Sequence, residues 1–211
     1  THQPRHHQAA ALLQTWGRQC DQFVAFSNAT NPTIGALDLG MPHESYGNMW
    51  QKTRRILAYV DEHYRDFDFV HVCGDDVYLL VDNLRGFLQP FLDSQEPLFF
   101  GQWIRQKNHP YLGGGPGYTI NSRALQVYMK NASSTCYTDV VTSAEDRLLS
   151  SCLRQAGVLP RDTRDSKGQQ LYHDVAPHTL YVTDATGRSF HDRQAQYWAT
   201  LPPPHTMGST V

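Results

Sequence analysis

Two adjacent aspartates interrupt an apolar run near the middle of the chain. Residues 67–81 are rich in valine and phenylalanine, stop at Gly74-Asp75-Asp76 and then resume as apolar sequence. A short, nearly continuous apolar segment is typical of a buried parallel strand, and α/β folds bind ligands at the carboxyl edge of such a sheet. Because adjacent carboxylates repel each other, Asp75 and Asp76 favour a nearby divalent cation. The simpler alternative is a turn that carries two solvated acids.

Strand-like and helix-like segments alternate around this stretch. The expected helices cover residues 6–18 and 48–64 and begin near Val81, Ser122 and Glu145, with Asp82, Ser122 and Ser143 as N-caps. The expected strands cover residues 22–26, 67–73, 97–101 and 118–120, with an edge strand at 181–182 and a loop over 31–46. This alternation predicts an α/β fold with a mostly parallel central sheet flanked by helices.

A glycine-rich segment lies between two of these strands. Residues 113–118 read Gly-Gly-Gly-Pro-Gly-Tyr, with four glycines in the first five positions. Glycines in such a run let the backbone approach a ligand closely or make turns with positive φ. The segment is not a GxGxxG motif directly after the first strand, so it does not support a dinucleotide-binding fingerprint.

Composition narrows the function classes. The chain has 211 residues, 40% of them hydrophobic, which is enough for one domain with a substantial core. The net charge of −2, from 18 Lys and Arg against 20 Asp and Glu, argues against a general nucleic-acid binder. No apolar run is long enough to span a bilayer. The chain opens at Thr1 rather than Met, so we expect that a targeting segment can precede it.

Cysteines and sequons favour the secretory pathway. The four cysteines are Cys20, Cys73, Cys136 and Cys152. None forms a CxxC pair, which argues against a zinc ribbon, whereas Cys136 and Cys152 flank a polar segment and could form a local disulfide. Acceptor sequons occur at Asn28 and Asn131, although such sequons are common by chance. Disulfides and sequons together are typical of proteins folded in an oxidising compartment.

Three further charged residues have both a simple and a functional interpretation. Glu145 and Asp146 fall in the first turn of an expected helix, where acids complement the helix dipole. An acid on the wall of a site could equally be the general base for an acceptor hydroxyl. Lys52 lies in the helix expected over residues 48–64, where a solvated charge is the default interpretation.

Taken together, these motifs resemble the fringe and core 1 β1,3-galactosyltransferase clan, with the core 1 family as the better match. The resemblance is carried, in one order along nearly the whole chain, by Thr15–Cys20, Gln51–Tyr64, Gly74–Arg85, Glu96–Gly101, Gly113–Tyr118 and Cys136–Cys152. It implies a GT-A-like glycosyltransferase fold, in one catalytic domain over residues 1–211 that is truncated at both ends. It also implies a type II membrane protein of the Golgi lumen, anchored through an upstream segment, with a homodimer as one expected assembly.

The resemblance implies an activity and a role for each matching residue. The activity is inverting transfer of galactose from UDP-galactose to GalNAc that is O-linked to Ser or Thr of a glycoprotein or glycopeptide, in a single metal-assisted displacement. Asp76 and Asp75 would ligate Mn²⁺, and Lys52 and Asp75 would contact the donor. Asp146 would be the catalytic base. The acceptor side would contain Glu145, Gly113, Gly114 and Tyr118. Cys136 and Cys152 would be disulfide-bonded, and no nucleic acid would be bound.

The chain departs from the family pattern at the metal site. Gly74 stands where the family has the first of three acids, and the family's metal-binding histidine would align just beyond Val211. Two alternatives therefore stay open. One is a fringe-like transferase of another sugar, such as GlcNAc. The other is a catalytically inactive, chaperone-like relative, which the presence of Asp75, Asp76 and Asp146 disfavours.

Overall fold

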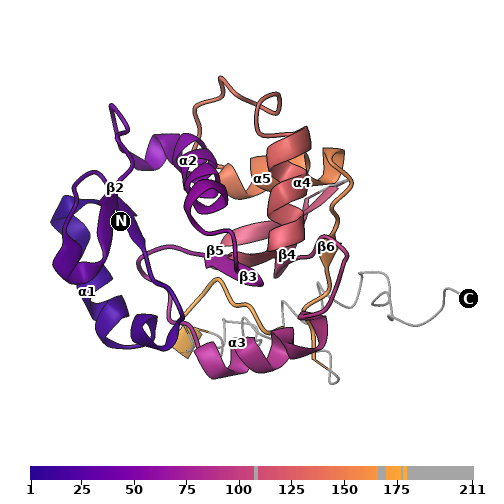
Figure 1. The fold of residues 1–211 in the computed structure, drawn as a ribbon, viewed down its shortest axis with the longest axis horizontal. Helices are drawn as coiled ribbons and strands as arrows, with labels where there is room; N and C mark the ends of the chain where they lie inside the picture. Colours follow the sequence, from indigo (N-terminus) through magenta and orange to yellow (C-terminus); the bar gives the residue numbers. More distant parts are fainter. Residues whose placement is uncertain (107–108, 166–169, 177, 180–211) are drawn as a thin grey trace, which may run out of the picture.

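A computed structural model describes residues 1–106, 109–165, 170–176 and 178–179. Figure 1 shows a central sheet with helices α2, α4 and α5 on one side and α3 on the other, while α1 and a small second sheet lie at one end. The edge strand expected at 181–182 lies outside the described residues. Among the described helices, none has the length and apolar character that crossing a membrane requires.

The central sheet has four strands in the order β3-β5-β4-β6. These strands are β3 (Phe69–Val72), β4 (Phe99–Gln106), β5 (His109–Asn121) and β6 (Pro160–Arg161). A separate two-stranded parallel sheet pairs β1 (Ala25–Ser27) with β2 (Ala36–Asp38), a strand inside the segment expected to be a loop. The α/β class with a GT-A-like fold is confirmed.

The central sheet is mixed, however, rather than mostly parallel. Strand β5 runs antiparallel to both β3 and β4, and only the pairing of β4 with β6 is parallel. The reason is that the glycine-rich segment is itself part of a long strand that follows β4 after two residues. A connection that short joins antiparallel neighbours, because a parallel crossover needs a dozen or more residues.

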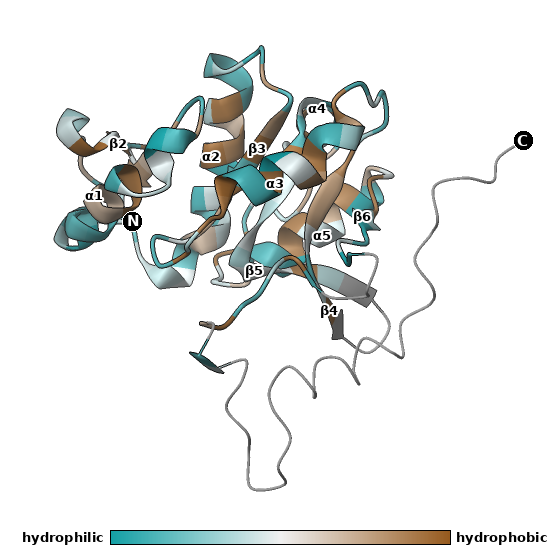
Figure 2. Cartoon of the chain, turned by 90° about the horizontal axis from the view of Figure 1, so that it is seen from below, coloured by the Kyte–Doolittle hydropathy of each residue, from teal (hydrophilic) through white to brown (hydrophobic). Residues whose placement is uncertain are grey.

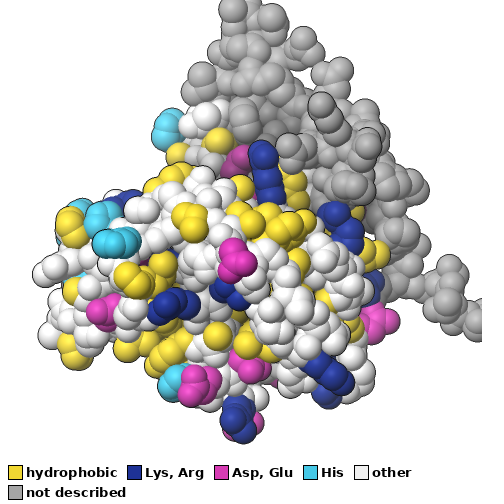
Figure 3. All heavy atoms as spheres, turned by 90° about the horizontal axis from the view of Figure 1, so that it is seen from above, with side chains coloured by type: hydrophobic (Ala, Val, Ile, Leu, Met, Phe, Trp, Pro, Cys, Tyr) yellow, Lys and Arg dark blue, Asp and Glu magenta, His cyan; other side chains and the backbone are white. Residues whose placement is uncertain are grey.

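In the described part of the chain, four α-helices flank the central sheet and a fifth, α1, lies at one end, all near the expected positions. They are α1 (His6–Gln14), α2 (Met49–His63), α3 (Val81–Leu88), α4 (Ser122–Asn131) and α5 (Glu145–Gln155). Hydrophobic and hydrophilic residues alternate along α2 and α3, as surface helices require (Figure 2). In Figure 3, basic and acidic side chains are interspersed over the face shown, and histidines gather at the end where α1 lies.

The core lies on both faces of the sheet. Phe99 and Phe100 are adjacent on β4 and are both fully buried, because successive strand residues point to opposite faces. Phe99 belongs to the larger cluster, with Trp50 of α2 and Leu149 of α5. Phe100 belongs to a second cluster beneath α3. A strand buried on both faces reads as continuous apolar sequence, which explains how these strands could be located from the sequence.

The helix caps differ from those expected. Asn121 rather than Ser122 caps α4, because the Asn121 side chain accepts a hydrogen bond from the Ala124 backbone nitrogen at 2.9 Å. The same oxygen accepts from the Leu98 backbone nitrogen at 2.9 Å, so this cap also ties β5 to the start of β4. Helices α3 and α5 begin without a side-chain cap. Because Asn121 is also held by its bond to Leu98, which is distant in sequence, the residues next to it do not mark it as the cap.

Candidate active site

The site forms where β5 leaves its partner strand. The β4–β5 register runs from Gly101↔Tyr118 to Gln102↔Gly113, so residues 114–117 have no partner on β4. An extra segment of this kind bends a strand out of its ladder and is typical of site-forming positions. The glycine-rich segment is therefore a bulge at the edge of the site, rather than a free loop between two elements.

One end of the bulge closes on the end of β3. Gly117 has a φ of +79°, and a Cβ at this position would lie 2.5 Å from the Val72 carbonyl oxygen and 2.6 Å from Cys73 Cβ. Only glycine fits such a close approach at positive φ. The bulge therefore packs directly against the residues that precede Gly74-Asp75-Asp76.

Asp75 and Asp76, the acid pair after β3, lie in different surroundings. The Asp75 side chain is only 10% exposed, and its Oδ1 lies 2.8 Å from Arg5 Nη2. Its second oxygen, Oδ2, is buried without a hydrogen-bond partner. Asp76 is exposed. Trp16 fixes the segment from the other side, because its Nε1 donates to the Val77 carbonyl at 3.1 Å.

Helix α2 brings a buried cation to the same region. Lys52 is 4% exposed, so the default expectation of a solvated charge is wrong. Its ammonium group donates to the Glu44 carboxylate and, at 2.7 Å, to the Thr1 carbonyl. The Thr1 backbone nitrogen lies 3.9 Å from Asp75 Oδ2. Thr1 therefore lies between Lys52 and Asp75, and the two residues expected at the donor belong to one cluster.

The other end of the bulge faces the start of α5. The Gly114 backbone nitrogen donates to Asp146 Oδ2 at 3.0 Å, and the Arg147 nitrogen donates to Asp146 Oδ1 at 2.7 Å. A Cβ on Gly114 would lie 2.4 Å from Glu145 Oε1. Gly114, Glu145 and Asp146 are thus brought together, with the Asp146 carboxylate held by two backbone N–H groups.

Glu145 lies in an environment that favours its protonated form. Burial, and then the neighbouring Asp146 charge, raise the pKa of Glu145 to about 7. Tyr118 is 2% exposed, and burial together with the Glu145 charge raises the pKa of its hydroxyl. That hydroxyl faces Thr53 of α2 and Glu145 without a well-formed hydrogen bond to either. The region around Gly114 therefore holds a carboxyl group whose pKa is raised to near neutrality.

Gly113 does not join this group. The direction in which a Gly113 side chain would point faces Ile104, because a Cβ there would lie 2.6 Å from Ile104 Cδ1. Gly115 faces Asp174, whose Oδ1 accepts from Gln102 Nε2 at 3.1 Å. Successive strand residues point to opposite faces, so only Gly114 of these three glycines faces Glu145 and Asp146.

Sequence reasoning missed three residues of the site: Arg5, Glu44 and Thr53. Arg5 contacts Asp75 across seventy positions of sequence, which leaves no local signal. Thr53 follows Lys52 directly in the Gln51-Lys52-Thr53 motif, and this adjacency is the signal that could have identified it. Glu44 lies in the segment 31–46, for which the sequence predicted only a loop.

The acid pair provides oxygen ligands that suit Mn²⁺ or Mg²⁺. Asp75 Oδ2 is a buried oxygen without a hydrogen-bond partner, and Asp76 is accessible. Within the ranges that the structure describes, no group of three or more His, Cys, Asp or Glu side chains gathers to hold a metal ion. If this pair held a metal ion, the remaining ligands would have to be supplied by bound phosphate and water.

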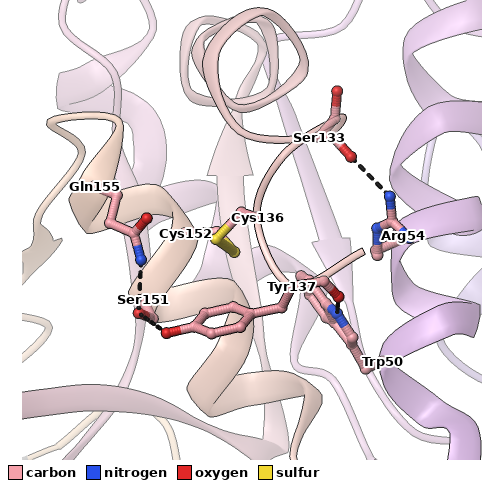
Figure 4. Close-up of a disulfide and its surroundings, with 8 residues drawn as sticks. All are labelled: Trp50, Arg54, Ser133, Cys136, Tyr137, Ser151, Cys152 and Gln155. Carbon is pink, nitrogen blue, oxygen red and sulfur yellow. Dashed lines mark hydrogen bonds between the residues drawn. A yellow bond between two sulfur atoms is a disulfide. The ribbon is translucent and has the colours of Figure 1, made fainter. Parts of the chain in front are cut away.

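A disulfide anchors α5, the helix that carries Glu145 and Asp146. Cys136 and Cys152 are bonded, with their Cα atoms 5.8 Å apart, and they join the segment after α4 to the middle of α5. Figure 4 shows Tyr137 beside this bond, where its carbonyl accepts from Trp50 Nε1 of α2 at 2.9 Å. The expected disulfide is confirmed. Cys20 and Cys73 are free thiols, and the sequon residues Asn28 and Asn131 are both exposed.

A mixed sheet flanked by helices makes this an α/β fold of GT-A-like type, with one acid pair after β3 and a second acid pair, at the start of α5, that contacts the bulge. The chain is similar to β1,3-glycosyltransferases. It is 28% identical over 197 residues to the glycoprotein-N-acetylgalactosamine 3-beta-galactosyltransferase 1 of Xenopus laevis, covering 90% of this chain and 52% of that protein. This similarity confirms the resemblance to the core 1 family.

Two β-1,3-glucosyltransferases are also similar to the chain. The Mus musculus protein is 22% identical over 151 residues, covering 70% of this chain and 30% of that protein. The Homo sapiens protein is 22% identical over 187 residues, covering 85% and 36% respectively. No family model matches the chain. The chain spans about half the length of the Xenopus relative and less of the other two.

Proposed function

We propose that the chain is the catalytic region of an inverting β1,3-galactosyltransferase that moves galactose from UDP-galactose to GalNAc O-linked to Ser or Thr. The observation that carries the proposal is the position of the bulge between two acidic groups. Gly114 binds Asp146, while Gly117 closes on the segment that leads to Asp75 and Asp76. Three residues of chain span at most about 10 Å, and one sugar ring would bind across this bulge, between an acceptor base and a donor diphosphate.

Asp146 would act as the general base. Its carboxylate takes the proton from the acceptor hydroxyl as that oxygen attacks the anomeric carbon of galactose. The bond from the anomeric carbon to the β-phosphate oxygen breaks in the same step, so UDP leaves on the opposite face and the configuration inverts. The backbone bonds from Gly114 and Arg147 hold the carboxylate in place for this in-line geometry.

Asp75 and Asp76 would hold Mn²⁺ at the donor side. When bound there, the metal ion neutralises the negative charge that develops on the departing UDP. Lys52 belongs to the same cluster and would contribute a fixed positive charge near the diphosphate. Arg5, which now pairs with Asp75, adds a second cation at this end of the site.

The cellular setting follows from the same proposal. We assign the protein to the Golgi lumen, with a membrane anchor in an upstream segment and with the capacity to form a homodimer. The Cys136–Cys152 disulfide supports an oxidising compartment. The exposed positions of Asn28 and Asn131 make both sequons accessible for glycosylation.

A donor-by-acceptor screen tests the proposal. UDP-galactose, UDP-glucose and UDP-GlcNAc are each offered with a GalNAc-bearing glycopeptide and with alternative sugar acceptors. We expect transfer from UDP-galactose to GalNAc, and Asp146→Asn should retain UDP binding while losing transfer. The similarity to β-1,3-glucosyltransferases favours including glucose among the donors. Transfer of glucose or GlcNAc alone would replace the galactose assignment, and no transfer with any pair would favour the inactive, chaperone-like alternative.

A further inference from the structure

Glu44 is a buried carboxylate that pairs with Lys52. The Glu44 side chain is 6% exposed and the Lys52 side chain is 5% exposed, and the two are in direct contact. Lys52 comes from the first turns of α2, whereas Glu44 precedes that helix by a few residues. A buried ion pair adds little stability compared with apolar residues of similar size. Its position next to Asp75 therefore suggests a role in the site.

The segment around Glu44 is held rigidly. The Ser45 backbone nitrogen donates to Asn48 Oδ1 at 2.9 Å, as part of a capping box at the start of the turn before α2. The Asn48 side chain also donates to the His43 carbonyl. The residues on both sides of Glu44 are thus bonded to one asparagine. This arrangement fixes the backbone from which the Glu44 carboxylate reaches Lys52.

Within the residues that the structure describes, the hydrogen bonds of Lys52 leave one of its donors unused. An ammonium group has three N–H donors, and Glu44 and the Thr1 carbonyl accept two of them. The second Glu44 oxygen, Oε2, and Asp75 Oδ2 are both buried without hydrogen-bond partners. The two carboxylate oxygens are acceptors and cannot bind an anion, so the remaining Lys52 N–H is the group of this cluster that a phosphate oxygen would satisfy.

We propose that Glu44 is a positioning residue of the donor site, which holds the Lys52 ammonium beside Asp75 so that its third N–H binds the diphosphate of a nucleotide-sugar. This inference rests on the proposed function, and it adds a residue that acts only through Lys52. Without Glu44, the flexible Lys52 side chain has no carboxylate to fix its direction. The diphosphate then loses a preoriented charge-assisted hydrogen bond.

Calorimetric titration of UDP in the presence of Mn²⁺ tests this role. The variants are Glu44→Gln, Lys52→Met and the double variant, with Glu62→Gln as the control because Glu62 is a 76% exposed acid near the other end of α2. We expect about tenfold or greater weakening of UDP binding in each single variant, and wild-type binding in the control. Because Glu44 acts through Lys52, Glu44→Gln should cause no further loss when Lys52 is already Met.

Four results would overturn the inference. Wild-type UDP affinity in a folded Glu44→Gln variant would remove Glu44 from the donor site, as would losses that simply add in the double variant. If the wild-type chain binds no UDP, the proposed function fails first and this inference falls with it. Should Glu44→Gln not fold, the apolar pair Glu44→Met with Lys52→Met should restore folding without UDP binding. Tight UDP binding by that apolar pair would exclude the role.

Discussion

The Gly114 backbone nitrogen lies 3.0 Å from Asp146 Oδ2, which links the glycine-rich bulge of β5 to the first turn of α5. These residues are separated by 32 positions in sequence. The bond fixes the direction of the Asp146 carboxylate and places Gly114 against Glu145. The position of the acids at the start of α5 therefore depends on a backbone contact with a glycine.

Gly114→Ala should impair transfer more than folding. The new Cβ would lie 2.4 Å from Glu145 Oε1 and 3.3 Å from Asp146 Cβ. Because the end of a glutamate side chain can move, the free energy of unfolding should change by less than about 1 kcal/mol. The displaced acids should lower kcat about 10- to 100-fold. Gly86→Ala is the control, since a Cβ there meets nothing within 4 Å, and an equal loss of activity in both variants would contradict this prediction.

Gly117→Ala should instead destabilise the fold. A side chain at a φ of +79° is strained, and its Cβ would meet the Val72 carbonyl oxygen at 2.5 Å, where the backbone cannot give way easily. We expect a loss of at least about 1–3 kcal/mol in the free energy of unfolding, measured by urea denaturation. Wild-type stability would show that the bulge does not pack against β3 as described.

Asp76→Ala should abolish the Mn²⁺ dependence of UDP binding. Asp76 is the exposed member of the acid pair and so is the more accessible ligand. Titration of UDP with and without Mn²⁺ measures the effect, and we expect the metal-dependent gain in affinity to disappear. Asp82→Ala, an exposed acid in the first turn of α3, should keep that gain. Retention of metal-dependent binding by Asp76→Ala would remove Asp76 from the metal site.

Replacing both Cys136 and Cys152 by Ser should lower stability. The disulfide closes a loop with a sequence separation of 16 residues, and a loop of about this size contributes about 3 kcal/mol by restricting the unfolded chain. Urea unfolding under non-reducing conditions measures the loss. Cys20→Ser removes a thiol outside the disulfide, and its midpoint should stay close to that of the wild type. A double variant as stable as the wild type would contradict this prediction.

His71 should make the fold sensitive to acid. Burial lowers the pKa of His71 from 6.5 to about 4, and its Nδ1 bonds Thr119 Oγ1, which in turn bonds the Tyr172 hydroxyl. Below pH 6.5 the unfolded state binds a proton that the folded state does not, so stability falls as the pH drops from about 6.5 to about 4 and is fully present above that window. The loss should approach about 3 kcal/mol.

Unfolding titrations from pH 7.5 to 4 measure this loss in the wild type and in His71→Phe. The variant removes the titrating group, so its stability should fall less steeply over this window. His63→Gln serves as the control, because His63 is a half-exposed histidine on α2, and the control should keep the wild-type slope. An unchanged slope in His71→Phe would assign the acid sensitivity to other groups.

The sequence by itself located most helices and strands, the acid pair and the disulfide. Most of these features are marked by the residues next to them in the sequence. Phe99 and Phe100 mark a strand because both faces of the sheet are covered, and α2 shows apolar residues at helical spacing. Asp75 and Asp76 follow a buried strand directly, and Cys136 and Cys152 flank one short polar segment. The helices, the strands and the acid pair depend on neighbours within a few residues, whereas the disulfide, which joins residues 16 positions apart, was implied by the family resemblance.

Only the tertiary structure decided how these parts meet. The direction of β5 follows from its pairing with β3 and β4, and this pairing makes the sheet mixed and turns the glycine run into a bulge. The pairing of Lys52 with Glu44, and that of Asp75 with Arg5, follow from packing rather than from spacing. A charged side chain on an amphipathic helix faces solvent unless a partner from elsewhere covers it. Arg5 reaches Asp75 from seventy positions away, and Glu44 reaches Lys52 because of the path of the segment before α2, so neither contact can be read from adjacent residues.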